Sequence, residues 1–348
     1  MRVLIVKTSA LGDIVHALPV LDFLHKVSPG IEVDWIVEER FADILQGNSL
    51  LSRLYTVDTR KWRSALFSGT TWREITAVKA GLADRRYNIV FDLQGNIKSG
   101  LIARFSGCGR RYGFDADAVR ESANLRFTTN HVPLRSQDHH VTARSLRVVS
   151  VPFGKDYSGM ELAAEIATSS DDDQAAELFL ATLLDGLVFL FHPGTTWKTK
   201  LWNESGWIKL GQELTDRFPD ATILISWGGA DERHVAERIA AGVGRHTRLL
   251  PQLTIKGFAA MIKKVDIMFG GDTGPIHIAA AVGTPTVSFY RATDGKRNGP
   301  RGEMHRIVQS PLPCTKCLSR ECDRDDVCRE SISVNDMMAA VNELLHNR

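Results

Sequence analysis

The sequence has no long hydrophobic run. Nowhere in its 348 residues does a stretch of about 18 apolar residues occur without charges, so we expect no membrane-spanning helix. The apolar run between Arg2 and Lys7 has only four residues, which is too short for the core of a secretory signal. We therefore expect the protein to stay in the cytoplasm.

The sequence also lacks a strong excess of either charge. The formal net charge is +2 at pH 7, and 24% of the residues are charged against 43% that are hydrophobic. These values are ordinary for a globular protein. The field of the whole molecule argues neither for nor against a nucleic acid, and we expect none as a partner. An anionic ligand would have to be bound by a local group of cations.

Two common nucleotide-binding motifs are absent. Neither the dinucleotide fingerprint GxGxxG nor the phosphate-binding loop GxxxxGK[ST] occurs in the sequence. Their absence weighs against an NAD-dependent dehydrogenase and against a P-loop ATPase.

Short runs rich in valine and isoleucine alternate with amphipathic stretches along the whole chain. This pattern is typical of parallel sheets with crossover helices. The chain is longer than a single core usually allows, so we expect two domains, at residues 1–168 and 169–348. The expected fold class is α/β, with two Rossmann-like, doubly wound domains that face each other across a cleft.

The same patterns predict individual elements. In the first domain we expect strands at residues 3–6, 33–37 and 89–93, and helices at 13–27 and 138–149. A polar stretch at 167–174 ends the linker and starts the next helix. In the second domain we expect strands at 188–192, 222–226, 266–269 and 286–289, and helices at 207–218, 233–243 and 334–345. We expect the last helix to pack back on the first domain.

Three loops follow expected strands and precede expected helices. They are TSALGD at 8–13, HPGTTWKTK at 192–200 and GGDTGPIH at 270–277. Backbone amides at a helix start, with small residues that admit close approach, are well suited to bind anions. Glycine and aspartate are also common in ordinary strand-to-helix turns, so each loop alone has a purely structural explanation.

Asp13 lies at or just inside a predicted helix start. One interpretation is an N-terminal cap, a frequent role of aspartate at that position. The other is a general base that takes a proton from an attacking sugar hydroxyl, kept ionised by the helix dipole. The residue pattern alone favours neither.

The second domain offers candidates for a diphosphate site. The hydroxyls of Thr195 and Thr196 and the ammonium groups of Lys198 and Lys200 could stabilise a departing diphosphate, although a solvated basic loop would have the same composition. In the third loop, Gly274 would let the backbone approach a phosphate. The other candidates there are Asp272, Thr273 and His277, and Glu232 beyond another strand could accept hydrogen bonds from ribose hydroxyls.

At this point the motifs resemble those of a known family. MRVLIVKTSALGDIVHALP, HPGTTWKTKLW and GGDTGPIHIAAAVGTP look like the bacterial ADP-heptose:lipopolysaccharide heptosyltransferases of glycosyltransferase family 9. The resemblance continues through VDWIVEERFADI, RKWR and DLQGNIKSG, and it is strongest to heptosyltransferase I, which adds a heptose to Kdo. The family implies a GT-B fold and inversion at the anomeric carbon without a metal cofactor.

The resemblance also implies roles for residues. Asp13 matches the catalytic base, and Lys200 matches a residue that stabilises the leaving ADP. The donor site is implied at Thr195, Thr196, Glu232, Asp272, Thr273, Gly274 and His277, and the acceptor site at Arg60, Arg63 and Arg120. The implied partners are ADP-heptose, Kdo-lipid A and the cytoplasmic surface of the inner membrane, on which the protein would lie peripherally. Trp197 departs from the polar residue expected after the paired threonines.

Four of the five cysteines lie close together in the sequence. Cys314, Cys317, Cys322 and Cys328 have the spacing C-x2-C-x4-C-x5-C. Four thiolates at such spacing can hold a structural zinc or iron ion, and some relatives bind iron there. Unligated thiols, or disulfides formed only after cell lysis, remain the alternative.

The same residues leave other functions open. The acceptor could be a second core heptose or a protein serine, and the donor could be another nucleotide sugar. A nucleotide-sugar-binding protein without activity is the non-enzymatic alternative, which the presence of both Asp13 and Lys200 disfavours.

Overall fold

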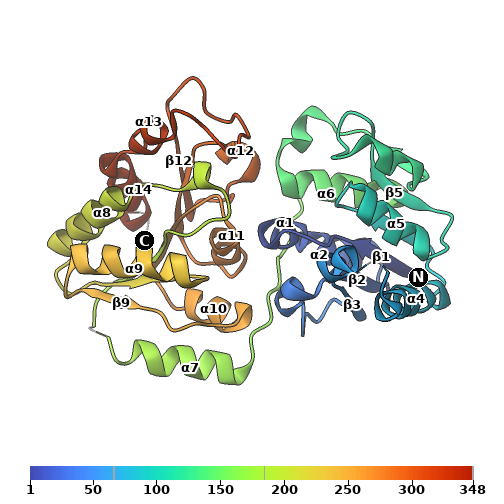
Figure 1. The fold of residues 1–348 in the computed structure, drawn as a ribbon, viewed down its shortest axis with the longest axis horizontal. Helices are drawn as coiled ribbons and strands as arrows, with labels where there is room; N and C mark the ends of the chain where they lie inside the picture. The colour runs from blue at the N-terminus through green and yellow to red at the C-terminus, as the bar shows by residue number, and fades with distance from the viewer. Residues whose placement is uncertain (66, 184, 347–348) are drawn as a thin grey trace. The chain divides into compact units, whose positions relative to one another are not determined.

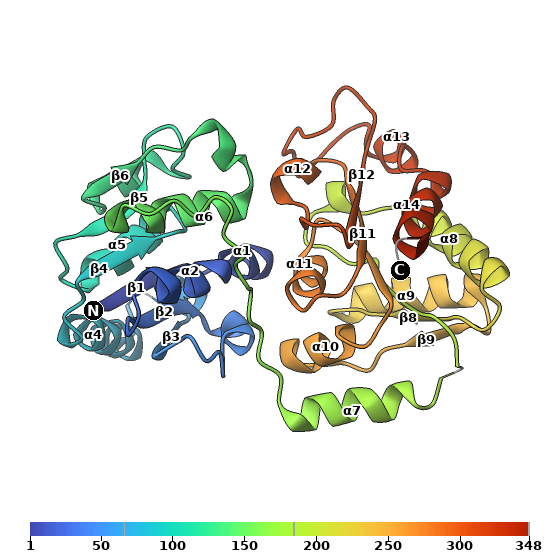
Figure 2. The ribbon, with the colours of Figure 1, turned by 180° about the vertical axis from the view of Figure 1, so that it is seen from behind.

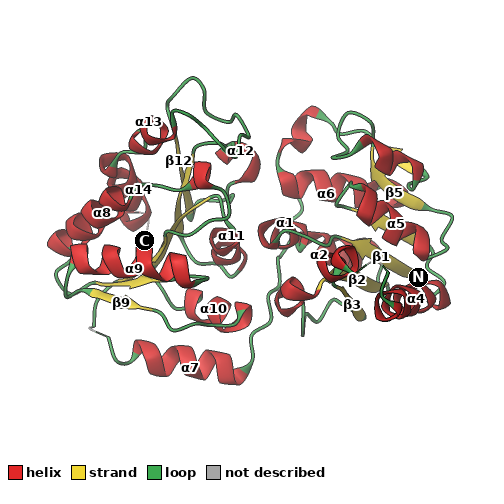
Figure 3. Ribbon diagram, in the orientation of Figure 1, coloured by secondary structure: helices red, strands yellow, loops and turns green. Residues whose placement is uncertain are grey.

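The computed structural model describes residues 1–65, 67–183 and 185–346 of the chain. The chain divides into two compact units, Met1–Ala167 and Thr168–Arg348. Figures 1 and 3 show that each unit is a sheet covered by helices. The second unit is seen from its other side in Figure 2, with α7 running beside α10. The predicted α/β class with two doubly wound units is confirmed.

In the first unit, the described residues form a parallel sheet in the order β3-β2-β1-β4-β5-β6. Its strands are β1 (Arg2–Val6), β2 (Glu32–Glu38), β3 (Arg53–Val57), β4 (Ile89–Asp92), β5 (Arg111–Phe114) and β6 (Asn130–Val132). Its α-helices are α1 (Leu11–Ala17), α2 (Pro19–Val27), α3 (Thr59–Ser64), α4 (Gly69–Asp84), α5 (Ile97–Phe105) and α6 (Val141–Ser150). Short 3-10 helices lie at Glu39–Ile44, Ser122–Arg126, Ser136–His139 and Val151–Phe153.

The second unit repeats this topology. Its described strands are β7 (Val188–His192), β8 (Thr222–Ile225), β9 (Thr247–Leu249), β10 (Ile267–Gly271), β11 (Thr286–Tyr290) and β12 (His305–Gln309), in the order β12-β11-β10-β7-β8-β9. Its helices are α7 (Ser170–Leu180), the 3-10 helix η5 (Lys198–Lys200), α8 (Glu204–Arg217), α9 (Ala230–Val243), α10 (Ile255–Ile262), α11 (Gly274–Ala281), α12 (Gly295–Asn298), α13 (Asp325–Glu330) and α14 (Val334–His346).

The strand order creates one switch point in each sheet. The chain leaves the sheet centre in opposite directions from β1 and β4, and likewise from β7 and β10. In open parallel sheets, ligands bind outside the carboxyl ends of the strands at this point. The loops that follow these four strands are therefore where a site is expected.

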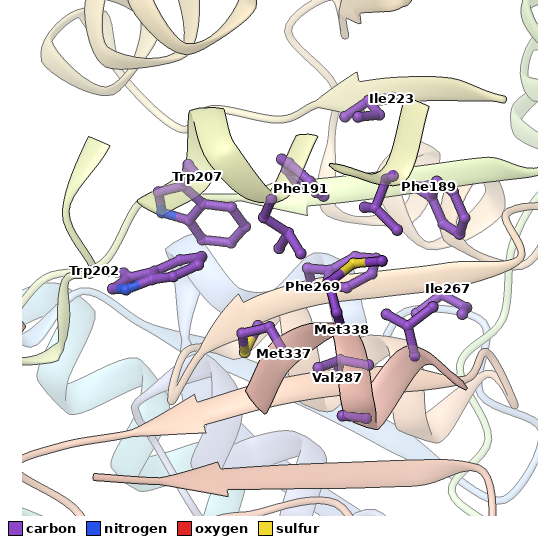
Figure 4. Close-up of a cluster of buried hydrophobic side chains, with 14 of the residues drawn as sticks. Phe189, Phe191, Trp202, Trp207, Ile223, Ile267, Phe269, Val287, Met337 and Met338 are labelled. Carbon is purple, nitrogen blue, oxygen red and sulfur yellow. The ribbon is translucent and has the colours of Figure 1, made fainter. Parts of the chain in front are cut away.

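The core of the second unit is rich in aromatic residues. Phe189, Phe191 and Phe269 of the sheet are fully buried and pack ring against ring, at centroid distances of 5.9 and 5.2 Å between Phe269 and the other two. Met337 and Met338 of α14 join the same cluster (Figure 4). Thus α14 packs on its own unit, against β12 and α8. Its predicted packing on the first unit stays a prediction.

Some predicted boundaries are wrong. The helix expected at 13–27 is two helices, because Pro19 starts α2 and has no N–H to continue α1. The helix expected at 138–149 begins only at Val141, where His140 caps it by accepting a hydrogen bond from Thr142 N. The helix expected at 207–218 begins at Glu204, capped by Asn203, which accepts from Gly206 N at 2.6 Å. The short edge strands were missed because they bury few residues.

Among the helices that the structure describes, none is both long enough and apolar enough to cross a membrane.

Candidate functional site

In the first unit, the loop after β1 is fastened to its neighbours at the switch point. Trp35 Nε1 donates to Lys7 O at 3.0 Å, and Glu38 N donates to Thr8 O at 3.1 Å. Ser9 N donates to the side chain of Gln94, in the loop after β4, at 3.2 Å. The loop that leads into α1 is thus held from both neighbouring strands.

Asp13 is the third residue of α1 and is half-buried. Its carboxylate accepts a hydrogen bond from Ala10 N at 3.3 Å, across the start of the helix. It therefore closes the first turn of α1 but is not the N-cap residue, which is Ala10. Among the described residues this is the one hydrogen bond to its carboxylate, so an oxygen remains available to accept a proton.

A buried lysine lies beside Asp13. Lys7 is 8% exposed, and its ammonium donates to Leu93 O at 3.0 Å. Burial lowers the pKa of Lys7, while the nearby carboxylates of Asp13 and Asp92 oppose that shift. The positive charges of Arg120 and Arg144 lower it further. The predicted base Asp13 and the predicted acceptor residue Arg120 thus both lie close enough to Lys7 to act on its charge.

The other predicted acceptor cations lie on α3. Arg60 and Arg63 are exposed there, and Arg60 lies close enough to Arg40 to lower the pKa of that guanidinium, although burial is the larger cause. The start of α3 is joined to α5, because Lys98 Nζ donates to Thr59 Oγ1 at 2.8 Å. The same ammonium pairs with the buried carboxylate of Glu38 at 2.7 Å.

In the second unit, an ion pair joins the loops that follow β7 and β10. Lys200 Nζ lies 2.7 Å from Asp272 Oδ2 and also donates to Asp272 O at 3.2 Å. His277 Nε2 lies 3.2 Å from Asp272 Oδ1, and Asn298 Nδ2 donates to Oδ2 at 3.1 Å. One carboxylate thus connects Lys200, α11 and α12 at the switch point.

The electrostatics of Asp272 follow from these contacts. Burial would raise the pKa of its carboxyl, since its side chain is only 6% exposed. The hydrogen bond from His277 and the charge of Lys200 outweigh burial and hold the pKa of Asp272 well below its usual range. Asp272 is therefore ionised at neutral pH and holds a cation beside it.

The loop after β7 differs from the expected helix start. Thr195 is half-buried and Thr196 exposed, and the chain then forms the 3-10 helix η5 before α8 begins. Lys200 is thus presented by a short 3-10 turn, and the first amides of α8 belong to a separate turn.

Glu232 is brought directly against the loop after β7. A Cβ atom at Gly194 would lie 2.4 Å from the Glu232 carboxyl carbon, so only glycine permits this approach. The carboxylate is held by Gly228 N, which donates to Oε2 at 2.6 Å. Glu232 itself is half-buried in the first turn of α9.

The loop after β10 leads straight into a helix. Thr273 is the N-cap of α11, in an extended conformation, and Gly274 is its first residue. Pro275 has no N–H and Ile276 N donates to Thr273 O at 3.2 Å, so the N–H of Gly274 is the one amide among the first three residues of α11 that can bind an anion. His277, predicted to donate to a phosphate, is 5% exposed, and its Nε2 faces Asp272.

The four clustered cysteines are not gathered around a common point. Cys314, Cys317 and Cys322 are exposed and Cys328 is half-buried. In the described part of the chain, no three side chains of His, Cys, Asp or Glu lie close enough to share a metal ion. As they lie here, the thiols do not form the predicted ligand set.

Several residues that lie at the two switch points could not be predicted from the sequence. Lys7, Gln94 and Lys98 lie in motifs that were recognised, but a single lysine or glutamine in a loop carries no signal of its own. Asn298 is far from Asp272 in the sequence, and no local pattern joins them.

Comparisons with known proteins agree on one family. The model of glycosyltransferase family 9 (heptosyltransferase) matches residues 75–327. A lipopolysaccharide heptosyltransferase 1 from Pseudomonas aeruginosa is 34% identical over 92% of this chain and 87% of its own. The structure of Escherichia coli heptosyltransferase WaaC with ADP has a TM-score of 0.80 and 28% identity, covering 99% of this chain and 100% of that one. WaaC with ADP-2-deoxy-2-fluoro heptose has a TM-score of 0.78 and 29% identity, with 99% of each chain covered.

Proposed function

This chain belongs to glycosyltransferase family 9, and we propose that it transfers L-glycero-D-manno-heptose from ADP-heptose to the Kdo region of the lipopolysaccharide inner core. The observation that carries the proposal is the pair of switch points. One presents an accessible carboxylate, Asp13, and the other an anion-binding loop built on Lys200 and Asp272. A relative with 28% identity over nearly the whole chain binds ADP.

In the proposed reaction, Asp13 accepts the proton of the acceptor hydroxyl. The oxygen then attacks the anomeric carbon from the face opposite ADP, so the configuration inverts. The bond from that carbon to the diphosphate oxygen breaks, and negative charge accumulates on ADP. Lys200 and the backbone N–H of Gly274, the first residue of α11, stabilise this charge.

The proposed donor-binding residues contact two different parts of ADP, the diphosphate and the ribose. The hydroxyls of Thr195 and Thr196 and the backbone at Thr273 and Gly274 are proposed to contact the diphosphate. Glu232 is proposed to accept hydrogen bonds from the ribose, which suits a half-buried carboxylate beside the glycine of the loop.

Arg60, Arg63 and Arg120 are proposed to bind the anionic acceptor. Their exposed guanidinium groups suit carboxylate and phosphate groups of Kdo-lipid A. Arg60 and Arg63 are also proposed to draw the protein to the anionic cytoplasmic face of the inner membrane. Replacing both by serine should weaken sedimentation with anionic vesicles and raise KM for the acceptor. Unchanged values for both would remove these residues from the account.

No step of the proposed reaction passes through a metal ion. A structural zinc or iron ion at the four cysteines is a separate proposal, which requires the thiols to move together from their positions here. Elemental analysis of protein purified without a metal-affinity tag tests it. A metal content near zero per chain would end that proposal.

The direct test of function is ADP release from ADP-heptose and Kdo-terminated lipid A without added divalent metal. Release that needs both substrates supports the proposal. ADP-heptose binding without release would keep the donor and redirect the search to other acceptors, such as a second core heptose or a protein serine. Absence of both binding and release would contradict the proposal.

A further inference from the structure

The segment at 311–324 carries three of the four clustered cysteines. It is hydrogen-bonded to the second unit near the loop that follows β7, residues 193–200, which we call the diphosphate loop. Lys316 N donates to Arg291 O at 2.9 Å, and Leu318 N donates to Ala292 O at 2.8 Å, just beyond the end of β11. We call residues 311–324 the cysteine segment. In Figure 1 it lies within the loop that joins β12 to α13.

The cysteine segment also touches the loop after β7. Thr199 Oγ1 donates to Ser319 O at 2.7 Å, so the turn that presents Lys200 is bonded to the segment. Arg291 adds a second link, between the residue that follows the diphosphate loop and the residue that follows the cysteine segment. Its buried guanidinium donates to both Leu201 O and Asp325 O. The position of Ser319, and hence of its neighbour in sequence, is therefore fixed relative to the diphosphate loop.

That neighbour is Arg320. Its guanidinium and the ammonium of Lys200 both lie over the same aromatic ring. The guanidinium carbon of Arg320 lies 4.8 Å from the centroid of the Trp197 ring, and Lys200 Nζ lies 4.7 Å from the same centroid. Cations are attracted to an indole ring at such distances. Whatever their directions from the ring, the two cationic centres lie within about 10 Å of each other. A diphosphate that passes the edge of the ring can, with its hydrogen bonds, span such a gap.

The two cations differ in how their charge is balanced. Lys200 is paired with Asp272, which cancels most of its charge before any ligand arrives. Arg320 is exposed, and no carboxylate of the described chain lies within salt-bridge distance of it. A diphosphate brings more than one negative charge, so Lys200 alone leaves that charge undercompensated. A guanidinium stacked on a ring keeps its N–H edge available for phosphate oxygens.

We infer that Arg320 is a further donor-binding residue that contacts the diphosphate opposite Lys200, with Trp197 as the ring that holds both cations. The inference rests on the proposed function, because it extends the same donor site. It also explains why a tryptophan, Trp197, stands at a position where a polar residue is expected, because the indole ring holds both cations. Of the cysteine segment, it brings only Arg320 into the donor site.

The test is the affinity of the full-length protein for ADP and for adenosine, measured by titration calorimetry. Arg320→Ala should bind ADP roughly tenfold more weakly, because a charge-assisted contact to the diphosphate is lost. It should bind adenosine as the unsubstituted protein does, since adenosine has no phosphate. Arg320→Lys should recover part of the ADP affinity by keeping the charge.

Arg324→Ala is the matched control, because Arg324 is another exposed arginine of the cysteine segment. It removes the same charge and should leave the ADP affinity within about twofold. Equal ADP affinity of Arg320→Ala and the unsubstituted protein would overturn the inference. A loss that is equal for ADP and adenosine would overturn it too, because it would mean that Arg320 only shapes the loop. Failure of the unsubstituted protein to bind ADP would instead overturn the proposed function.

Discussion

Asp13 and Asp272 both follow a central strand at a switch point, yet their carboxylates have opposite surroundings. Asp13 is half-buried and, among the described residues, its carboxylate accepts a single hydrogen bond, from Ala10 N. Asp272 is buried and is held by Lys200, His277 and Asn298. A carboxylate that must take up a proton needs an accessible oxygen, whereas one that must position a cation needs to stay ionised and fixed. The surroundings of the two aspartates thus suit them to two different tasks.

The same substitution at both positions tests most directly whether Asp13 and Asp272 have different roles. Asparagine has the shape of aspartate but has no charge and is a far weaker base. We expect Asp13→Asn to lower kcat for ADP release by roughly a thousandfold, because the acceptor hydroxyl loses its base. The midpoint of thermal unfolding should fall only slightly, because the amide oxygen can still accept from Ala10 N although a negative charge near the buried Lys7 is lost. The Kd for ADP should not change. A loss of stability as large as the loss of rate would make Asp13 a structural residue.

We expect Asp272→Asn to act on stability first. The substitution leaves Lys200 without its charge partner in a largely buried position, which should lower the free energy of unfolding by about 3 kcal/mol. Chemical denaturation of both proteins measures the difference. An unchanged free energy of unfolding would show that the Asp272 contacts contribute little.

The same pair predicts a pH dependence. The pKa of Asp272 is held well below its unfolded value of about 4, so its contribution to stability is fully present above that value. The contribution is lost as pH falls below about 4, because the unfolded state then takes up a proton that the folded state does not. The stability difference between the unsubstituted protein and Asp272→Asn should therefore shrink as pH falls below about 4. A difference that does not change with pH would contradict the assigned ion pair.

A third variant tests the cation that Asp272 holds. Lys200→Met keeps most of the side-chain length and removes the charge. We expect kcat/KM to fall roughly 100-fold, because the leaving diphosphate loses electrostatic stabilisation. Steady-state kinetics with saturating acceptor measure the effect. An unchanged kcat/KM would remove Lys200 from the reaction.

The smallest effect is expected at the glycine beside Glu232. In Gly194→Ala the new methyl group would overlap the Glu232 carboxylate, which would have to move. We expect ADP affinity to fall about tenfold, as when a hydrogen bond from the ribose to a charged group is lost. Affinity for a ribose-free diphosphate should not change. Gly229→Ala serves as control, because a Cβ there meets open space.

Much of the fold could be predicted from the sequence, because buried parallel strands are short apolar runs between turn residues. The strand Val188–His192 was predicted to the residue, and the boundaries of β1, β2 and β11 were off by only one residue at either end. Helix starts were predicted less accurately than strands. Pro19 divides the first helix, and Asn203 starts α8 three residues early, because single capping residues are weak signals beside a long amphipathic pattern.

The site was predictable only where its chemistry lies in one loop. Asp13, Lys200 and Asp272 stand in contiguous motifs, and the ion pair between the last two follows from strand order rather than from either motif alone. Lys7 against Leu93 O, and Arg320 over Trp197, depend on contacts between residues 86 and 123 positions apart. No periodicity in one sequence encodes such contacts.

The most direct test of the account is the rate of ADP release by the unsubstituted protein and by Asp13→Asn, side by side. Both are supplied with saturating ADP-heptose and Kdo-terminated lipid A in the presence of a chelator. We expect turnover that needs both substrates in the first protein and a loss of roughly a thousandfold in the second, with equal ADP affinity. Turnover by Asp13→Asn at the rate of the unsubstituted protein would contradict it.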